Sequence, residues 1–164
     1  MTDALYCVVL KGGIFVTVIN EVKIKIESVI ENLDSAGLAE GEAERTVSEC
    51  DGFLRFSDGE SVITYSETGE GGTVSSEIRY KDGEATVKRS GAIESEMLFK
   101  EGFTHDSIYC VTPYKFDASV TTKKIRAQLD ECGGRLDLFY NMKIGGAEKS
   151  ARMKIWIQML SRKS

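Results

Sequence analysis

The alternation of apolar and polar residues with a period of two is the feature that most constrains how this chain folds. It runs in segments of strand length from Glu21 to Leu160, and most of the short breaks between segments contain glycine. Successive side chains of a β-strand point to opposite faces of its sheet, so the pattern predicts half-buried strands. Short breaks predict antiparallel neighbours, because a parallel return needs a crossover of about a dozen residues. The sequence therefore predicts an all-β fold made of consecutive hairpins.

The segments that show this alternation are predicted as strands. They span residues 21–32, 44–56, 61–67, 73–80, 85–90, 93–99, 105–112, 120–131, 135–144 and 149–160. Residues 85–90 and 93–99 form a predicted hairpin that bends at Gly91, where glycine permits unusual backbone angles. Segment 120–131 also fits a short helix that stops at Gly133-Gly134, and we predict a strand there.

Two irregularities are predicted within this pattern. Residues 34–42, which contain Gly37 and Gly41, are expected to connect the first two strands. Asp51-Gly52 is expected to form a bulge in the second strand, because glycine accepts the positive φ that one extra residue needs. The only proline, Pro113, is expected at a corner or a sheet edge.

The number and order of the strands favour a closed sheet. About eight to ten sequential antiparallel strands of a twisted sheet tend to close, because closure removes unpaired edges. We therefore predict a single up-and-down β-barrel. A two-layer sandwich is the alternative, and the lack of long connections between sheets disfavours it.

The chain of 164 residues is long enough for one domain with one core. Residues 21–160 are predicted to form the barrel domain, and residues 1–20 an N-terminal extension. Two interpretations of the extension stay open. It is an extra edge strand, or Lys11-Gly12-Gly13 is the translation of a purine-rich ribosome-binding sequence and the true start is a GTG codon at Val16 or Val18.

The amino-acid composition restricts which cellular compartment and which types of binding partner are expected. The cysteines show no metal-ligand spacing and no signal peptide accompanies them, so free cytosolic thiols are expected, with disulfides as the alternative. They are Cys7, Cys50, Cys110 and Cys132. The net charge is −5, and the basic residues concentrate after residue 104 without a basic run interleaved with aromatics. We expect a cytoplasmic protein that binds neither nucleic acid nor membranes.

Motifs for catalysis are not found in the sequence. His105 is the single histidine and is expected at the surface, so neither a histidine-dependent catalytic group nor a zinc site is predicted. No nucleophile elbow and no phosphate-binding glycine loop occurs. We predict no catalytic residue, no metal and no cofactor.

Arg89 is the residue that the alternation singles out. If Ala85 and Val87 face the core, the period of two turns Arg89 inward, where a permanent charge is costly unless it is paired. Glu67 shares inward parity with Tyr65, so an internal Arg89–Glu67 ion pair is one interpretation. The other is a ligand site, in which Arg89 binds a carboxylate or phosphate.

The predicted ligand site comprises Arg89, Glu67, Tyr65 and Tyr140. Its apolar lining is expected from Ile78, Met97 and Ile157. A barrel of about eight strands is wide enough either to be filled by side chains or to hold one small ligand.

Several ordered motifs resemble one family. They are Val87-Lys-Arg-Ser-Gly-Ala92, Ile63-Thr-Tyr-Ser-Glu67, Thr112-Pro113-Tyr114 and Gly134-Arg-Leu-Asp-Leu-Phe-Tyr140. In this order they resemble the YwiB-like bacterial proteins of unknown function. The resemblance covers about Val22 to Gln158 and implies a calycin-like barrel, similar to lipocalins, with no known reaction. Lys115 departs from the family pattern, which has glycine after Thr-Pro-Tyr.

Three functions remain open. The first is binding of a small amphipathic or anionic molecule inside the barrel. The second is a non-enzymatic interaction module with a solidly packed barrel, whose basic face around Lys149, Arg152 and Lys154 meets a protein partner. An enzyme is the third. The oligomeric state is not predicted.

Overall fold

The computed structural model describes residues 3–10 and 13–160, and in these ranges the chain consists of β-strands and their connections. The all-β prediction is confirmed. The strands are β1 (Asp3–Leu10), β2 (Gly13–Leu33), β3 (Ala39–Ser57), β4 (Glu60–Gly69), β5 (Gly72–Lys81), β6 (Glu84–Gly91), β7 (Ser95–Lys100), β8 (Thr104–Val111), β9 (Tyr114–Asp130), β10 (Gly133–Ile144) and β11 (Ala147–Met159).

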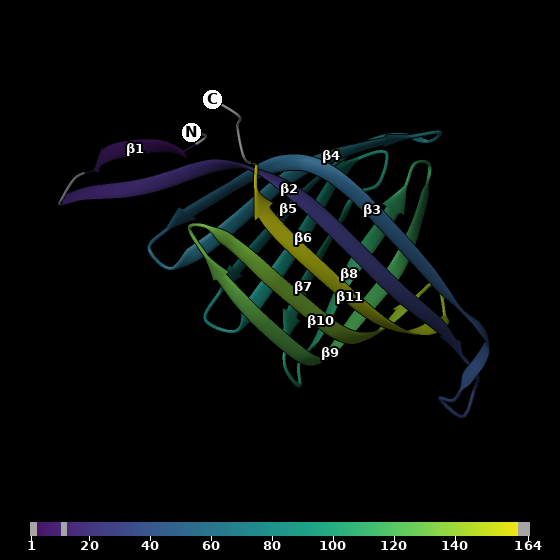
Figure 1. Ribbon diagram of the computed structural model, residues 1–164. Coiled ribbons are helices and arrows are strands. Elements are labelled where there is room, and N and C mark those ends of the chain that lie inside the picture. Colours follow the sequence, from purple (N-terminus) through teal and green to yellow (C-terminus); the bar gives the residue numbers. More distant parts are fainter. Residues whose placement is uncertain (1–2, 11–12, 161–164) are drawn as a thin grey trace.

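Ten of these strands form one antiparallel sheet that curls into a barrel (Figure 1). The order is β7-β6-β5-β4-β3-β2-β11-β10-β9-β8, and β1 pairs only with the start of β2. Sequential strands are neighbours except where β2 pairs with β11, which joins the early and late parts of the chain. The predicted up-and-down barrel is therefore confirmed.

The barrel closes between β7 and β8 through few backbone bonds. Glu94 and Cys110 exchange two hydrogen bonds, each 2.9 Å long. The Leu98 N–H donates to Nδ1 of His105 at 3.2 Å, and the Lys100 N–H donates to the Thr122 hydroxyl at 3.2 Å. Side chains thus replace part of the missing ladder, and the barrel is nearly closed.

Inward-facing aliphatic side chains fill the core. Many of them are fully excluded from solvent, and each stabilises the fold by about 1.5–3 kcal/mol relative to an exposed position. The most deeply buried include Val22, Ile24, Leu54, Ile63, Ile78, Leu136, Leu138 and Ile155. The ring of Phe99 packs edge-on against Tyr140, with 4.9 Å between ring centroids.

The bulge predicted at Asp51-Gly52 is wrong. Pairing of β3 with β2 is continuous through both residues, and the register shift lies instead between Ile30 and Asn32. Gly52 is needed for close approach: a Cβ there would collide with the backbone oxygen of Thr64 and lie 2.7 Å from Cδ1 of Ile24.

The predicted connection at 34–42 is shorter than expected. Strand β3 already begins at Ala39, and only residues 34–38 separate it from β2. Asp34 makes this turn compact, because its carboxylate accepts hydrogen bonds of 2.9 Å from the N–H groups of Ala36 and Leu38. Segment 120–131 falls almost entirely in β9, so the strand prediction there is confirmed.

Strand β3 separates from β4 early. The two strands pair only from Gly52 to Ser57, and Figure 1 shows β3 running away from β4 beyond this region. Between Ala39 and Asp51, β3 pairs with β2 along one edge and with no strand of the described chain along the other.

The predicted N-terminal extension corresponds to β1 and the first part of β2. Its backbone forms a hairpin in which Asp3–Leu10 pairs with residues 13–20. Lys11 and Gly12, on which the ribosome-binding interpretation depends, lie outside the described residues. The position of the true start stays a prediction.

Candidate functional site

Arg89 lies on β6 and faces into the barrel. The alternation along β6 buries Ala85 and Val87, and Arg89 has the same parity and is half-buried. Its cross-strand partners are Ser76 on β5 and Ser95 on β7, both buried, and Tyr65 on β4 lies opposite Ser76. Polar side chains therefore follow one another across four strands inside the barrel.

Two buried tyrosines experience the charge of Arg89. Tyr65 is 7% exposed and Tyr140 is 6% exposed. Burial raises the pKa of both phenols, and the positive charge of Arg89 partly offsets the increase in each. A hydrogen bond with Ser76 also lowers the pKa of Tyr65, whereas Glu67 and Cys50 raise it. We call Tyr65, Ser76, Arg89 and Tyr140 the Arg89 cluster.

The structure leaves Glu67 outside this cluster. Glu67 is exposed, and it forms no ion pair with Arg89; both residues are described. It lies at the end of β4, where the strand passes the barrel rim. The inward parity of Glu67 was inferred correctly from Tyr65, but parity does not show how far along a strand the core extends.

Cys50 is a neighbour that the sequence did not single out. It is half-buried and packs against the core from β3. Burial raises the pKa of its thiol, and the charges of Glu67 and Asp51 raise it further. Even-numbered residues of β3 face inward at Gly52 and Leu54, so continued alternation would have identified Cys50. The predicted bulge obscured this signal.

Ser76 was also overlooked, although it occupies an inward position between Val74 and Ile78. Its hydroxyl is buried and bonded to Tyr65. A buried serine in an otherwise aliphatic alternation is the signal that could have identified it.

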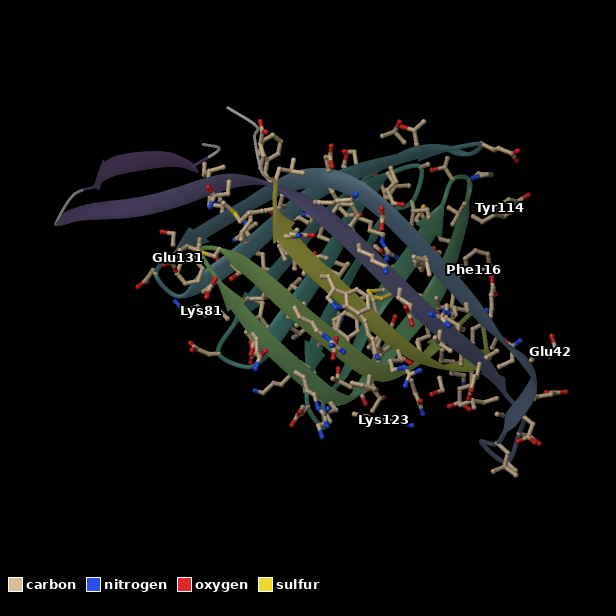
Figure 2. The ribbon with its side chains drawn as sticks, viewed as in Figure 1. Glu42, Lys81, Tyr114, Phe116, Lys123 and Glu131 are labelled. Carbon is tan, nitrogen blue, oxygen red and sulfur yellow. The ribbon has the colours of Figure 1, made fainter. Side chains whose placement is uncertain are left out.

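Exposed aromatic side chains form a rim at the end of the barrel where Arg89 lies. Tyr114 and Phe116 of β9 are 65% and 40% exposed, and Figure 2 labels both at this rim. They share parity with the buried Ala118 and Val120 further along the strand. Phe116 pairs with Tyr109 of β8, which packs against the core. Inward-facing aromatics thus continue beyond the core to the surface.

The predicted apolar lining belongs to the packed core instead. Ile78, Met97 and Ile157 are all buried in one continuous hydrophobic cluster. None of the three lines the pocket that includes Arg89 or the larger pocket over β3 to β6. These side chains therefore contribute to the hydrophobic packing inside the barrel.

A pocket of about 390 Å³ includes Arg89 and opens beside the incomplete β7–β8 closure. Lys88, Ile108 and Lys115 contribute to its lining, and Ile108 is 59% exposed. Glu94 and Glu96 also line it. Arg89 thus contributes to the lining of a pocket whose other residues, such as Lys88, Glu96 and Ile108, are mostly at outward-facing positions of β6 to β9.

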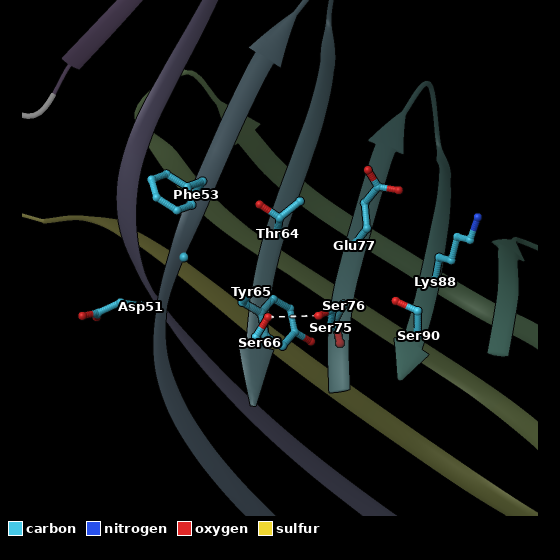
Figure 3. A pocket seen from close by; sticks show the side chains of 11 residues that line it. Asp51, Phe53, Thr64, Tyr65, Ser66, Ser75, Ser76, Glu77, Lys88 and Ser90 are labelled. Atoms are coloured by element: carbon cyan, nitrogen blue, oxygen red, sulfur yellow. Dashed lines mark hydrogen bonds between the residues drawn. The ribbon is translucent and has the colours of Figure 1, made fainter. Parts of the chain in front are cut away.

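A larger pocket of about 610 Å³ lies over β3 to β6, where β3 and β4 begin to separate (Figure 3). Its lining is rich in small hydroxyl side chains, including Ser66 and Ser75, whose oxygens lie 3.2 Å apart. Phe53 adds an exposed ring.

The outer face of β9, β10, β11 and β2 carries cations around one indole ring. Lys25 and Arg135 lie 5.4 and 5.3 Å from the ring centroid of Trp156. Arg135 also donates a 2.9 Å hydrogen bond to Asp137, which raises the pKa of the guanidinium. Of the basic face expected on β11, Arg152 is exposed, and Lys149 and Lys154 are half-buried.

Other features concern metals, thiols and membranes. No cluster of His, Cys, Asp and Glu suited to a metal ion occurs within the described part of the chain. Cys50, Cys110 and Cys132 are free thiols. Within residues 3–10 and 13–160, no helix has the length and hydrophobicity required to cross a bilayer.

Most of the chain matches the sequence model of one protein family. A model described as a domain of unknown function, DUF1934, matches residues 24–157. The chain belongs to the DUF1934 family. The matched segment begins in β2 and ends in β11, so the DUF1934 region comprises the barrel and leaves β1 outside it.

A curated relative and a solved structure agree with this assignment. The uncharacterized β-barrel protein YwiB of Bacillus subtilis is 26% identical over 128 residues, which cover 78% of this chain and 85% of YwiB. The crystal structure of the ywiB protein superimposes with a TM-score of 0.76 at 25% identity, over 87% of this chain and 94% of the other. The predicted relationship to YwiB-like proteins is confirmed, and DUF1934 brings no activity with it.

Proposed function

We propose that this DUF1934 protein is a cytosolic, calycin-like binding protein that holds a small amphipathic anion at Arg89. The observation that carries the proposal is the half-buried guanidinium of Arg89, which faces inward and forms no ion pair with any described carboxylate. A partly desolvated permanent cation gains free energy when an anion approaches it. A ligand carboxylate or phosphate would be such an anion.

The two tyrosines support anion binding. Because burial raises the pKa of Tyr65 and Tyr140, both phenols stay protonated at neutral pH. Neutral phenols do not cancel the charge of Arg89, and each keeps an O–H group that can donate a hydrogen bond. The Arg89 cluster thus combines one permanent cation with neutral donors.

The pocket beside the β7–β8 closure supports a small, partly apolar ligand. Its volume of about 390 Å³ lies within the range of small-molecule sites, about 300–1,000 Å³. Lys88 and Lys115 add positive charge near the entrance, which Glu94 and Glu96 partly offset, and Ile108 offers an apolar surface for the body of the ligand. We propose that the ligand enters at this closure and that its charged end reaches the inward-facing guanidinium of Arg89.

A non-enzymatic interaction module is the second candidate. The packed core favours it, because Ile78, Met97 and Ile157 are buried in one continuous hydrophobic cluster. In that function Arg89 only contributes to the fold, and the outer surfaces bind partners.

The test uses 8-anilinonaphthalene-1-sulfonate, a fluorescent probe with a sulfonate and an apolar ring system. The wild-type protein is expected to bind it at the Arg89 pocket, and Arg89→Met is expected to weaken binding about tenfold, equivalent to about 1.4 kcal/mol. Arg55→Met is the matched control, because Arg55 is exposed on the outside of β3. Near-ultraviolet circular dichroism checks that each variant is folded.

The free energy of unfolding of Arg89→Met distinguishes an internal ion pair of Arg89 with Glu67 from a ligand site at Arg89. Because Glu67 is exposed, Arg89→Met leaves no buried carboxylate unpaired, and its unfolding free energy should stay within about 1 kcal/mol of wild type. Native mass spectrometry of protein purified from its own host should show a retained small anion. Equal probe binding by Arg89→Met and wild type, together with a bare protein mass, would refute the binding function.

A further inference from the structure

The unpaired edge of β3 is a structural feature that the proposed ligand site does not explain. From Ala39 to Asp51 strand β3 pairs with β2 along one edge only, with an irregularity between Glu40 and Glu44, where the register shifts and Gly41 has a φ of 77°. No backbone hydrogen bond from the other edge to the described residues is found. An extended strand with free N–H and C=O groups is a template for another strand.

In addition, both faces of the β3 segment that carries this edge are exposed to solvent. Every residue from Ala39 to Val47 is exposed, whereas the same strand is buried at Gly52 and Leu54. Neither face of the segment is covered by the barrel, and Figure 1 shows it projecting from the barrel with the end of β2. An added strand would therefore meet no steric obstacle from the barrel core.

Charge selects the type of strand that fits. Glu40, Glu42 and Glu44 all lie in this segment, and none of the three forms an ion pair with a described residue. The one basic residue in the segment, Arg45, already forms an ion pair with Glu27, with 3.1 Å between Nη2 of the guanidinium and Oε2 of the carboxylate. The edge therefore has an excess of negative charge that a basic strand would neutralise.

The same charges disfavour a second copy of this edge. Two β3 edges that paired with each other would bring two acidic segments together, and like charges across a sheet are destabilising. Charged residues on edge strands are a common means of preventing self-association. The acidic residues thus disfavour pairing with a second copy of this chain and favour pairing with a basic strand.

We propose that the β3 edge from Ala39 to Asp51 binds an extended, lysine- or arginine-rich segment of a partner protein by adding it to the sheet. Backbone hydrogen bonds to β3 provide the pairing, as in other complexes formed by strand addition. The glutamates select basic side chains. The site is separate from the Arg89 pocket, which lies between β6 and β8.

The test uses a fluorescein-labelled peptide of about nine residues, in which lysine alternates with threonine or valine, a typical strand length and pattern. Fluorescence anisotropy should show binding that weakens as salt is raised, because the exposed charges are screened. The Glu40→Gln, Glu42→Gln, Glu44→Gln triple variant should bind at least about fivefold more weakly. Hydrogen exchange should slow at residues 39–51 when the peptide is bound.

Two controls separate strand addition from simple charge attraction. The Glu84→Gln, Glu131→Gln, Glu148→Gln triple variant changes the net charge equally at other exposed positions and should bind like wild type. A peptide of the same sequence with alternate amide nitrogens methylated keeps its charge but loses donors, and should not bind.

Three results would overturn the proposal. They are equal binding of the methylated and unmethylated peptides, equal loss in the two triple variants, and protection from exchange outside residues 39–51. A dimer that protects this segment without peptide, detected by analytical ultracentrifugation with hydrogen exchange, would assign the edge to a second copy and overturn the proposed partner.

Discussion

Gly52 is the position where a single added methyl group tests the packing of β3 against β4. In Gly52→Ala the new Cβ would collide with the backbone oxygen of Thr64, and would lie 2.7 Å from Cδ1 of Ile24 and 3.1 Å from Cβ of Tyr65. Thr64 pairs with Phe53 in the β3–β4 ladder, so its carbonyl cannot move without disturbing that ladder. Ile24 is fully buried and belongs to the hydrophobic core, so its side chain cannot turn out into solvent.

The magnitude follows from these contacts. Adding a methyl group to a well-packed site costs about 1–3 kcal/mol, and a clash with backbone places Gly52→Ala in the upper part of that range. With a urea dependence of about 2 kcal/mol per molar, the unfolding midpoint should fall by on the order of 1 M. Because 1 kcal/mol shifts the melting temperature of a chain of this size by about 2–4 °C, the melting temperature should fall by about 4–12 °C.

Gly71→Ala is the matched control. Gly71 lies in the β4–β5 turn, and a Cβ there would meet nothing within 4 Å. Its φ is outside the left-handed region, so alanine should leave stability unchanged or raise it by up to about 1 kcal/mol. Urea unfolding followed by tryptophan fluorescence, which reports Trp156, measures both variants. A change in Gly52→Ala as small as that of the control would show that the reasoning about close approach is wrong.

Two further predictions concern the barrel closure and the buried phenols. His105→Ala removes the acceptor for the Leu98 N–H and should cost about 1–3 kcal/mol in urea unfolding, whereas His105→Asn, which offers another acceptor, should cost less; equal losses would argue against the hydrogen bond. The pKa values of Tyr65 and Tyr140 are raised in the folded state, so the unfolded chain releases these protons first once the pH exceeds about 10. Stability should therefore fall above that pH, and less steeply in Tyr65→Phe and Tyr140→Phe; identical alkaline slopes would contradict the raised pKa values.

Much of the fold could be predicted because the alternation of period two is a direct consequence of strand geometry. The late hairpin of β10 and β11 shows this best, since Leu136, Leu138, Ile155 and Ile157 all face the core as their parity requires. Segment 120–131 was ambiguous because Ile125 and Leu129 also satisfy helical spacing, and only its neighbours β8 and β10 determine the strand.

The site was less predictable because it depends on depth along each strand. Parity placed Arg89, Tyr65 and Tyr140 on inward faces, but it could not show that Glu67 lies past the end of the core. Gly52 was misinterpreted for a related reason. A glycine that is needed for positive φ and one that is needed for close approach look the same in a sequence, and only the position of Thr64 on the next strand distinguishes them.

The pairing of β2 with β11 has a consequence for how the protein is made. Ile24 of the first barrel strand is the register partner of Ile157, so the ladder between them links residues that are synthesised far apart in time. Until the ribosome has released β11, the edge of β2 that pairs with β11 has no partner. The nascent chain then exposes apolar surface, which is the kind of surface that chaperones bind. We expect slow folding dominated by distant contacts, with completion of the cylinder as a late, post-translational event.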